Sequence, residues 1–136
     1  MTLYVPEASL ATMLEKILNQ SLTLKLYSNN VIPSAADTTA TYTEVSGGGY
    51  VSKTLTFANW VITPGGPAVA LYNAFQDWFF TGATDAPGTI FGYFVIQTTG
   101  GLLLWAERFP AATIPFVSQN GSLIRIKPRF TERNQP

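Results

Sequence analysis

Three consecutive glycines, Gly47, Gly48 and Gly49, constrain the fold of this chain more than any other feature of its sequence. Without Cβ atoms, their backbone reaches positive φ angles that other residues adopt only with strain. Residues 51–57 follow them and alternate apolar with polar side chains, which is the period of a half-buried β-strand. We therefore expect a strand, a glycine corner over residues 44–50 and a second strand. We interpret the corner as a sharp bend in an all-β domain, with a ligand-binding loop as the alternative.

The chain contains neither cysteine nor histidine. This excludes disulfides, thiolate nucleophiles, Ser-His-Asp and Cys-His catalytic groups, and zinc sites that use histidine. The three glycines also lack the lysine and the following helix of a phosphate-binding loop. We therefore expect that the protein is not an enzyme and that it holds no cofactor and no metal.

The charges of the chain are few and balanced. Eight basic and eight acidic residues give a net charge of zero, and charged residues make up only 12% of the 136 residues. A surface with little net charge has little repulsion to oppose association, so we expect a homo-oligomer. No segment has the composition of a signal peptide or approaches the roughly 18 apolar residues of a membrane span. We expect synthesis in the cytoplasm and no membrane partner.

The first 20 residues predict one short amphipathic helix. Pro6 and Glu7 are typical of a helix start, because proline fits the first turn and an early acid complements the helix dipole. The apolar side chains recur at helical spacing along one stripe, at Leu10, Met13, Leu14, Ile17 and Leu18. This stripe either packs on the chain's own domain or docks on a partner subunit. In the second case the partner-binding residues are Leu10, Met13, Leu14 and Ile17.

Two segments after the helix predict β-strands clearly. Residues 22–27 place three leucines on one face and Thr23, Lys25 and Tyr27 on the other, wet face. Residues 89–98 are apolar on both faces, which indicates a central strand, and Gly92 within them marks a bulge or close packing. Residues 68–80 are ambiguous between helix and strand, and we favour strand.

Two glycine-containing turns predict hairpins in the second half of the chain. Gly100-Gly101 is expected to join residues 89–98 to a strand over residues 102–109. Asn120-Gly121 is expected to join strands over residues 113–118 and 122–130.

About eight short strands with turns every 8–12 residues predict the fold class. We expect an all-β sandwich or jelly-roll-like domain preceded by one short amphipathic N-terminal helix. On this division residues 1–20 form an N-terminal arm and residues 21–136 form the β-sandwich domain.

Three cations alternate along the last predicted strand, in which Ile124 and Ile126 face inward. Arg125, Lys127 and Arg129 face outward, and they either contact an acidic or phosphate-bearing partner or form a solvated strand face near Glu107. No aromatic residue interleaves with them and the protein is neutral, so we expect no binding to nucleic acid. We include the three cations among the candidate partner-binding residues.

Two carboxylates, Asp77 and Asp85, lie on either side of Trp78, Phe79 and Phe80. Paired carboxylates can perform acid–base chemistry or hydrolyse a glycoside, but these two lie eight residues apart with no partner base, so we expect surface carboxylates. An aromatic residue exposed beside Asp77 would instead indicate an interface or a sugar platform.

The segment Tyr42-Thr43-Glu44-Val45-Ser46-Gly47-Gly48-Gly49-Tyr50, with Phe57 seven residues beyond it, resembles small virion structural proteins of tailed bacteriophages. Several flanking features are similar as well: residues 22–27, Asn30-x-x-Pro33, Gly92-Tyr93-Phe94-Val95, Ala106-Glu107-Arg108-Phe109 and Gly121-x-x-Ile124-x-Ile126. The resemblance covers residues 22–130 and does not include the N-terminal helix. A basic residue that usually follows the corner directly appears here only at Lys53.

The resemblance implies a protein of the virion. Two classes of virion protein are possible. The first is a capsid decoration or cement protein, a homotrimer on the outside of the head shell whose partners are its own copies and the major capsid protein. The second class is an adhesion module of the tail or fibre that binds a host surface glycan. We favour the capsid surface because the chain is one compact domain without a repetitive shaft segment.

Overall fold

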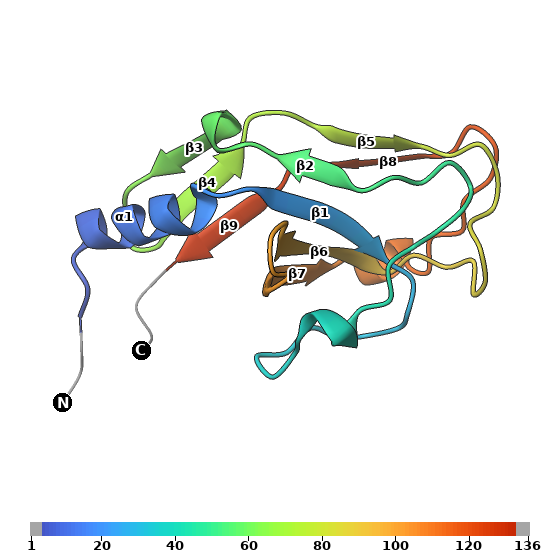
Figure 1. Cartoon of the computed structure of the whole chain (residues 1–136), viewed down its shortest axis with the longest axis horizontal. Helices are drawn as coiled ribbons and strands as arrows, with labels where there is room; N and C mark the ends of the chain where they lie inside the picture. Colours follow the sequence, from blue (N-terminus) through green and yellow to red (C-terminus); the bar gives the residue numbers. More distant parts are fainter. Residues whose placement is uncertain (1–3, 133–136) are drawn as a thin grey trace. The chain divides into compact units, whose positions relative to one another are not determined.

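The structure of the chain, a computed structural model, describes residues 4–132. Within them lie one α-helix, nine β-strands and three 3₁₀ turns (Figure 1). The regular elements are α1 (Glu7–Leu18), β1 (Leu22–Tyr27), β2 (Lys53–Leu55), β3 (Trp60–Thr63), β4 (Ala68–Tyr72), β5 (Gln76–Phe79), β6 (Gly92–Gln97), β7 (Leu103–Arg108), β8 (Leu123–Ile126) and β9 (Arg129–Glu132). The predicted class is confirmed, because the strands form antiparallel sheets in a sandwich-like all-β architecture, and one helix precedes them in the chain.

The described residues form two compact units. Within residues 4–132, unit 1 comprises residues 4–21, 56–76 and 126–132, and unit 2 comprises residues 22–55 and 77–125. The helix therefore shares a unit with segments from the middle and the end of the chain, whereas the sequence predicted a separate arm over residues 1–20.

In unit 1 the helix α1 covers a three-stranded sheet of order β3-β4-β9 (Figure 1). The central strand β4 buries Ala68 and Ala70, whose small side chains let a helix approach the sheet closely. On the helix, Leu10, Leu14 and Leu18 are 2% exposed or less. The apolar stripe of the helix thus packs on the chain's own sheet.

The ends of α1 lie where the sequence predicted them. Pro6 is the N-cap residue, and Glu7 in the first turn and Lys16 in the last turn complement the helix dipole. The helix ends at Leu18, and the amide of Asn19 donates to the carbonyl of Glu15 over 2.8 Å.

Unit 2 contains a four-stranded sheet of order β2-β1-β6-β7. The predicted central strand is confirmed: β6 lies between β1 and β7, and all of its residues except Gln97 are buried. The predicted hairpin between β6 and β7 is confirmed too, with Gly100 and Gly101 at φ angles of 89° and 71°.

An aromatic cluster fills one side of this sheet and corrects one prediction. Tyr27, which we expected on the wet face of its strand, is fully buried. Its ring lies 4.9 Å from that of Tyr42, which in turn stacks on Phe94 at 5.3 Å. Burial raises the pKa of Tyr27, and Arg108 opposes this shift. Tyr27 keeps its place in the alternation of β1, but its face is not wet at this end of the strand, because Tyr42 and Phe94 pack against it.

Gly92 marks close packing rather than a bulge. A Cβ atom at this position would meet the carbonyl of Glu107 and would lie 2.6 Å from the hydroxyl of Tyr27, so no side chain fits. The irregularity in the β6–β7 ladder lies instead between Val95 and Ile96.

The predicted second hairpin is wrong. Residues 113–118 form no strand, and only Phe116 makes a β-bridge, with Ile90. The strand that follows Asn120-Gly121, β8, pairs instead with β5 in a two-stranded sheet. Asn-Gly indicates a turn, but it does not specify which strand pairs beyond it.

The strand predicted over residues 122–130 is interrupted. β8 ends at Ile126 and β9 begins at Arg129, because Pro128 between them has no amide to donate to a ladder. The strand after the glycine corner is also shorter than residues 51–57: it spans Lys53–Leu55, and Val51 is exposed. The strand interpretation of residues 68–80 is confirmed by β4 and β5.

Candidate functional site

The glycine corner has the backbone that its sequence predicted. Gly47, Gly48 and Gly49 have φ angles of 74°, 61° and 83°. The carbonyl of Gly48 accepts the amide of Thr81 over 2.9 Å, and a Cβ atom on Gly48 would lie 2.8 Å from the carbonyl oxygen of Gly82. The space beside the corner is therefore filled by the chain's own residues 81–85.

Tyr50 fastens the corner to β1. Its hydroxyl donates to Oε2 of Glu44 over 3.0 Å and accepts the amide of Leu26 over 3.2 Å. Burial raises the pKa of Tyr50, and the neighbouring Glu44 raises it further. Glu44 also pairs with Lys25 at 3.1 Å. The corner thus has the contacts of a structural bend.

The two carboxylates singled out in the sequence lie with different partners. Asp85 accepts a hydrogen bond from the hydroxyl of Ser46 over 3.0 Å, beside the glycine corner. Asp77 forms two bonds with Arg125, from Nε to Oδ1 over 2.8 Å and from Nη2 to Oδ2 over 2.9 Å. The carboxylates are therefore not brought together as a catalytic pair.

The candidate residues of the helix divide into two groups. Leu10 and Leu14 are buried in unit 1 and are not accessible to a partner while that unit is folded. Ile17 is half-buried, and Met13 is exposed. A partner that contacts α1 without unfolding it meets Met13 rather than the leucines.

The three candidate cations are exposed, as expected, while Ile124 and Ile126 are buried. Arg125 belongs to unit 2, whereas Lys127 and Arg129 belong to unit 1.

Each of the three cations has its own surroundings. Lys127 lies over the ring of Phe75, 5.5 Å from its centroid, and Arg129 pairs with Leu71 in the β4–β9 ladder. Arg125 contacts Asp77 rather than Glu107, which accepts a bond from Tyr93 over 2.7 Å.

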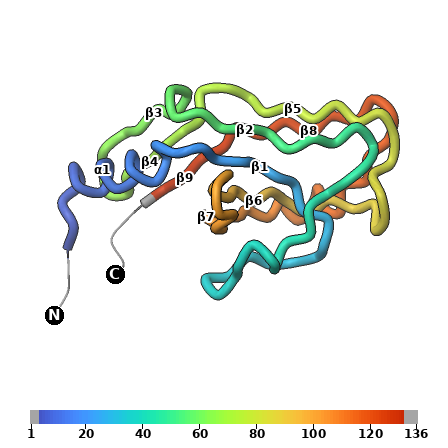
Figure 2. Tube along the Cα trace, viewed as in Figure 1, coloured from blue at the N-terminus to red at the C-terminus, as the bar shows by residue number. Residues whose placement is uncertain are grey.

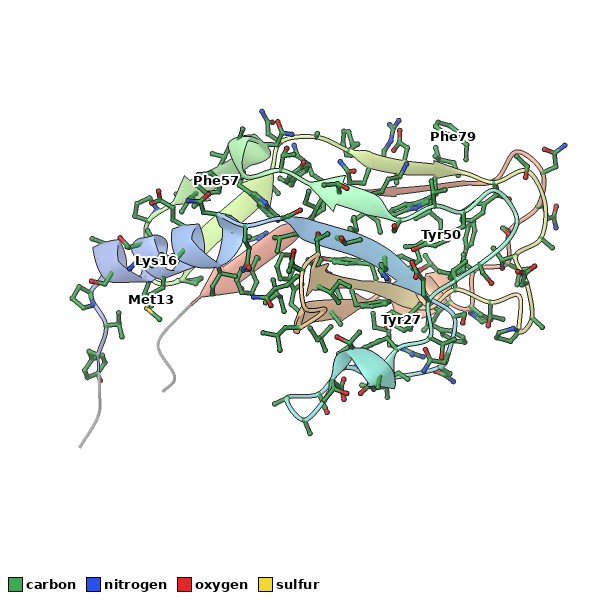
Figure 3. The ribbon with its side chains drawn as sticks, viewed as in Figure 1. Met13, Lys16, Tyr27, Tyr50, Phe57 and Phe79 are labelled. Atoms are coloured by element: carbon green, nitrogen blue, oxygen red, sulfur yellow. The ribbon has the colours of Figure 1, made fainter. Side chains whose placement is uncertain are left out.

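An exposed apolar and ionic surface surrounds the Arg125–Asp77 pair in unit 2. Phe79 lies two residues beyond Asp77 on β5, and Leu123 lies two residues before Arg125 on β8, so all four share one face of the two-stranded sheet. Phe79 is 65% exposed and projects from β5 in Figure 3, and Leu123 is 42% exposed. We call these four residues the β5–β8 outer face.

The electrostatics of this face are set by its ion pair. The hydrogen bonds from Arg125 hold the pKa of Asp77 below its usual value, and the positive charge of Lys53 acts in the same direction. The pair is geometrically specific, because a bidentate guanidinium–carboxylate contact fixes both side chains.

From the sequence we named Arg125 as a candidate partner-binding residue and treated an exposed aromatic residue beside Asp77 as a sign of an interface, but we did not single out Phe79 or Leu123. The period of two along each strand, counted from Asp77 and Arg125, was the signal that leads to Phe79 and Leu123.

Among residues 4–132, no group of three or more acidic, histidine or cysteine side chains is arranged to hold a metal ion. The same residues contain no helix with the length and apolar character needed to cross a membrane. Comparison of the chain with protein-family models, with curated proteins and with solved structures gave no match.

Proposed function

We propose that this chain is a structural protein of a tailed-bacteriophage virion that binds the outside of the capsid shell and stabilises it. In this role it acts as a homotrimer, made in the host cytoplasm, whose partners are its own copies and the major capsid protein. It performs no catalysis and binds neither nucleic acid nor membrane.

The β5–β8 outer face is the observation that carries the proposal. Aromatic residues and arginine are enriched in protein interfaces, and Phe79 and Arg125 lie exposed side by side with Leu123. Burial of Phe79 and Leu123 against a partner stabilises a complex through the hydrophobic effect. The Arg125–Asp77 pair lies in the same contact, where its fixed geometry favours one docking orientation.

Two further properties support a role in assembly. The glycine corner and its flanking segments resemble virion structural proteins, whose corners are structural, and the corner of this chain has positive φ angles at all three glycines and a Tyr50–Glu44 hydrogen bond beside them. The net charge of zero leaves little long-range repulsion between copies packed together on a shell.

Co-sedimentation with capsids assembled without this protein tests the proposal. We expect the wild-type chain to pellet with the shells, and Phe79→Ser to bind at least about tenfold more weakly because an interface aromatic is lost. Val117→Ser is the matched control, since Val117 is an exposed apolar residue of unit 2 outside this face. No sedimentation of the wild type, or equal binding of Phe79→Ser, contradicts the proposal.

The exposure of Phe79 beside Asp77 also favours a second candidate function, an adhesion module of the tail or fibre that binds a host glycan. An exposed ring beside a carboxylate can stack on a sugar and accept its hydroxyl groups. Binding to a host-glycan array, combined with no binding to capsids, would favour this candidate over the first.

A further inference from the structure

Two adjoining cavities lie along β7 in unit 2. The first, about 380 Å³, is lined by Pro33, Ser34, Ala35, Asp37 and Tyr42 on one side and by Leu103, Leu104, Trp105 and Ala106 on the other. The second, about 370 Å³, shares Asp37 and Leu103 with it and continues along Thr38, Thr39, Ala40, Gly101 and Leu102. We call the two together the β7 groove. Each cavity has the size of a ligand pocket.

The groove runs along the edge of β7 rather than over a face of the sheet. Side chains alternate between the two faces of a strand, so a cavity over one face is lined by every second residue. Here four consecutive residues, 103–106, line one cavity. Within residues 4–132, β7 is the last strand of its sheet and no strand pairs with its other edge.

The edge of β7 presents backbone groups to this groove. In an antiparallel ladder, residues alternate between those that bond the neighbouring strand and those whose amide and carbonyl point away from it. The amide of Phe109 donates to the carbonyl of Phe91 over 2.9 Å, so by this alternation the amide and carbonyl of Ala106 point to the groove.

The opposite wall of the groove, the cyan loop in Figure 2, is fastened at both ends of β7. At one end, Arg108 donates to the carbonyl of Val31 over 2.9 Å and to Oδ1 of Asn30 over 2.7 Å. At the other end, the hydroxyl of Thr39 donates to the carbonyl of Gly101 over 2.5 Å. The loop therefore follows β7 without pairing with it, and the groove between them is already formed in the free protein.

Asp37 gives the groove a negative charge. It is the one charged residue among the described residues that line the two cavities. Its carboxylate accepts the hydroxyl of Tyr42 over 2.6 Å, and the amide and hydroxyl of Ser34 over 2.9 Å each. These bonds, that of Tyr42 foremost, lower the pKa of Asp37, so the group is ionised at neutral pH.

We propose that the β7 groove binds an extended peptide segment, which adds to the free edge of β7 as a further strand. Main-chain hydrogen bonds to β7 supply affinity, and alternate side chains of the peptide contact the groove walls. Those walls are apolar at Pro33, Ala35, Leu103 and Trp105, and they are charged only at Asp37. The matching segment has alternating apolar side chains and one lysine or arginine that reaches Asp37. This inference does not depend on the proposed role on a capsid.

A panel of synthetic peptides tests the proposal directly. Each is a capped hexapeptide of alternating Val and Thr with one Lys, placed at a different position in each member. Binding is followed through the backbone amide signals of the ¹⁵N-labelled full chain. We expect at least one member to bind below about 1 mM and to shift the signals of residues 103–106 and of Asp37.

Three controls separate strand addition from other binding. Ala35→Trp fills the groove, whereas Ala36→Trp adds the same ring at a neighbouring exposed position that does not line it. We expect the first to weaken binding at least about tenfold and the second to leave it unchanged. N-methylation of every second peptide amide removes hydrogen-bond donors and keeps every side chain. Two such patterns exist, on the odd or on the even amides, and only one of them blocks the amides that face β7. That pattern should weaken binding by a similar factor. Replacing Lys by Glu should weaken binding as well.

The proposal is overturned if no panel member binds below about 1 mM, or if both tryptophan variants bind equally. It is also overturned if both N-methylated peptides bind as well as the parent peptide. Oligosaccharides that shift the same signals when the peptides do not would assign the groove to sugars and likewise overturn it.

Discussion

The glycine corner and the loop of residues 33–39 are both connections rich in small side chains in unit 2, yet their surroundings are opposite. At the corner, residues 81–85 fill the available space and donate backbone bonds to it. Along β7, the loop is held by side-chain bonds at its two ends and leaves two cavities beside the strand. Small residues thus allow close packing at the corner, whereas along β7 they leave a preformed groove.

The largest effect is expected at the filled corner, from Gly48→Val. The new side chain would force a non-glycine residue to a φ of 61° and would place Cβ 2.8 Å from the carbonyl oxygen of Gly82. Backbone strain and overpacking together should destabilise the protein by about 4 kcal/mol. Thermal unfolding should then occur roughly 10–20 °C lower.

Gly100→Val is the matched control for the corner. Gly100 also has a positive φ, 89°, but no atom lies within 4 Å of its Cβ position. The Gly100→Val variant should therefore be destabilised by backbone strain alone, which costs about 1–3 kcal/mol of unfolding free energy. If the two variants melt together, the corner is not closely packed and the comparison fails.

The same distinction between covered and uncovered residues applies to α1. Leu14→Ala removes a fully buried side chain and should cost about 3 kcal/mol, whereas Met13→Ala removes an exposed one and should change the free energy of unfolding by less than about 0.5 kcal/mol. Denaturant unfolding of both variants measures the difference. Equal costs would show that the helix does not pack on unit 1 as described.

A smaller effect is expected in the β7 groove, on the pKa of Asp37. Tyr42→Phe removes the hydroxyl that donates to Asp37, so the pKa of Asp37 should rise toward its usual value of 3.8. Because the folded pKa is lowered, the stability that these bonds contribute is present above pH 3.8 and is lost as pH falls through the folded value.

NMR titration of the carboxyl carbon of Asp37 measures this shift. The phenylalanine variant should also lose less stability than the wild type between pH 4 and pH 2. An unchanged titration would mean that Tyr42 does not hold the carboxylate in solution.

Sequence patterns predicted the elements whose conformation depends on residues close together in the chain. The stripe from Leu10 to Leu18 and the helix start at Pro6 and Glu7 predicted α1, and the three glycines predicted the positive φ angles of the corner. Period-two alternation predicted β1, and continuous apolar character predicted the central position of β6.

Pairing between distant segments was not predictable in the same way. The partner of β8 is β5, more than 40 residues earlier in the chain, and no local pattern specifies that choice. Pro128 did carry a signal, since a proline within a strand pattern indicates an interruption. The β7 groove had no local signal, because its walls come from residues 33–42 and 101–106 and meet only in the fold.

The candidate site was only partly predictable, because it too depends on pairing between distant segments. The outward direction of Arg125 followed from alternation, but its bidentate contact with Asp77 depends on the β5–β8 pairing. The exposure of Phe79 likewise depends on which face of that sheet is covered. A run of aromatic residues alone did not distinguish Phe79 from its buried neighbours Trp78 and Phe80.

We propose that the β5–β8 outer face is the surface by which the protein attaches to a virion shell. Hydroxyl-radical footprinting of the free protein and of the protein on purified particles tests it most directly, because Phe79 is exposed and readily oxidised when free. We expect particle binding to protect Phe79 and Leu123, while Val117, exposed elsewhere on unit 2, should be oxidised equally in both states. Equal oxidation of Phe79 in the two states, or recovery of the protein only from tails, would contradict the claim.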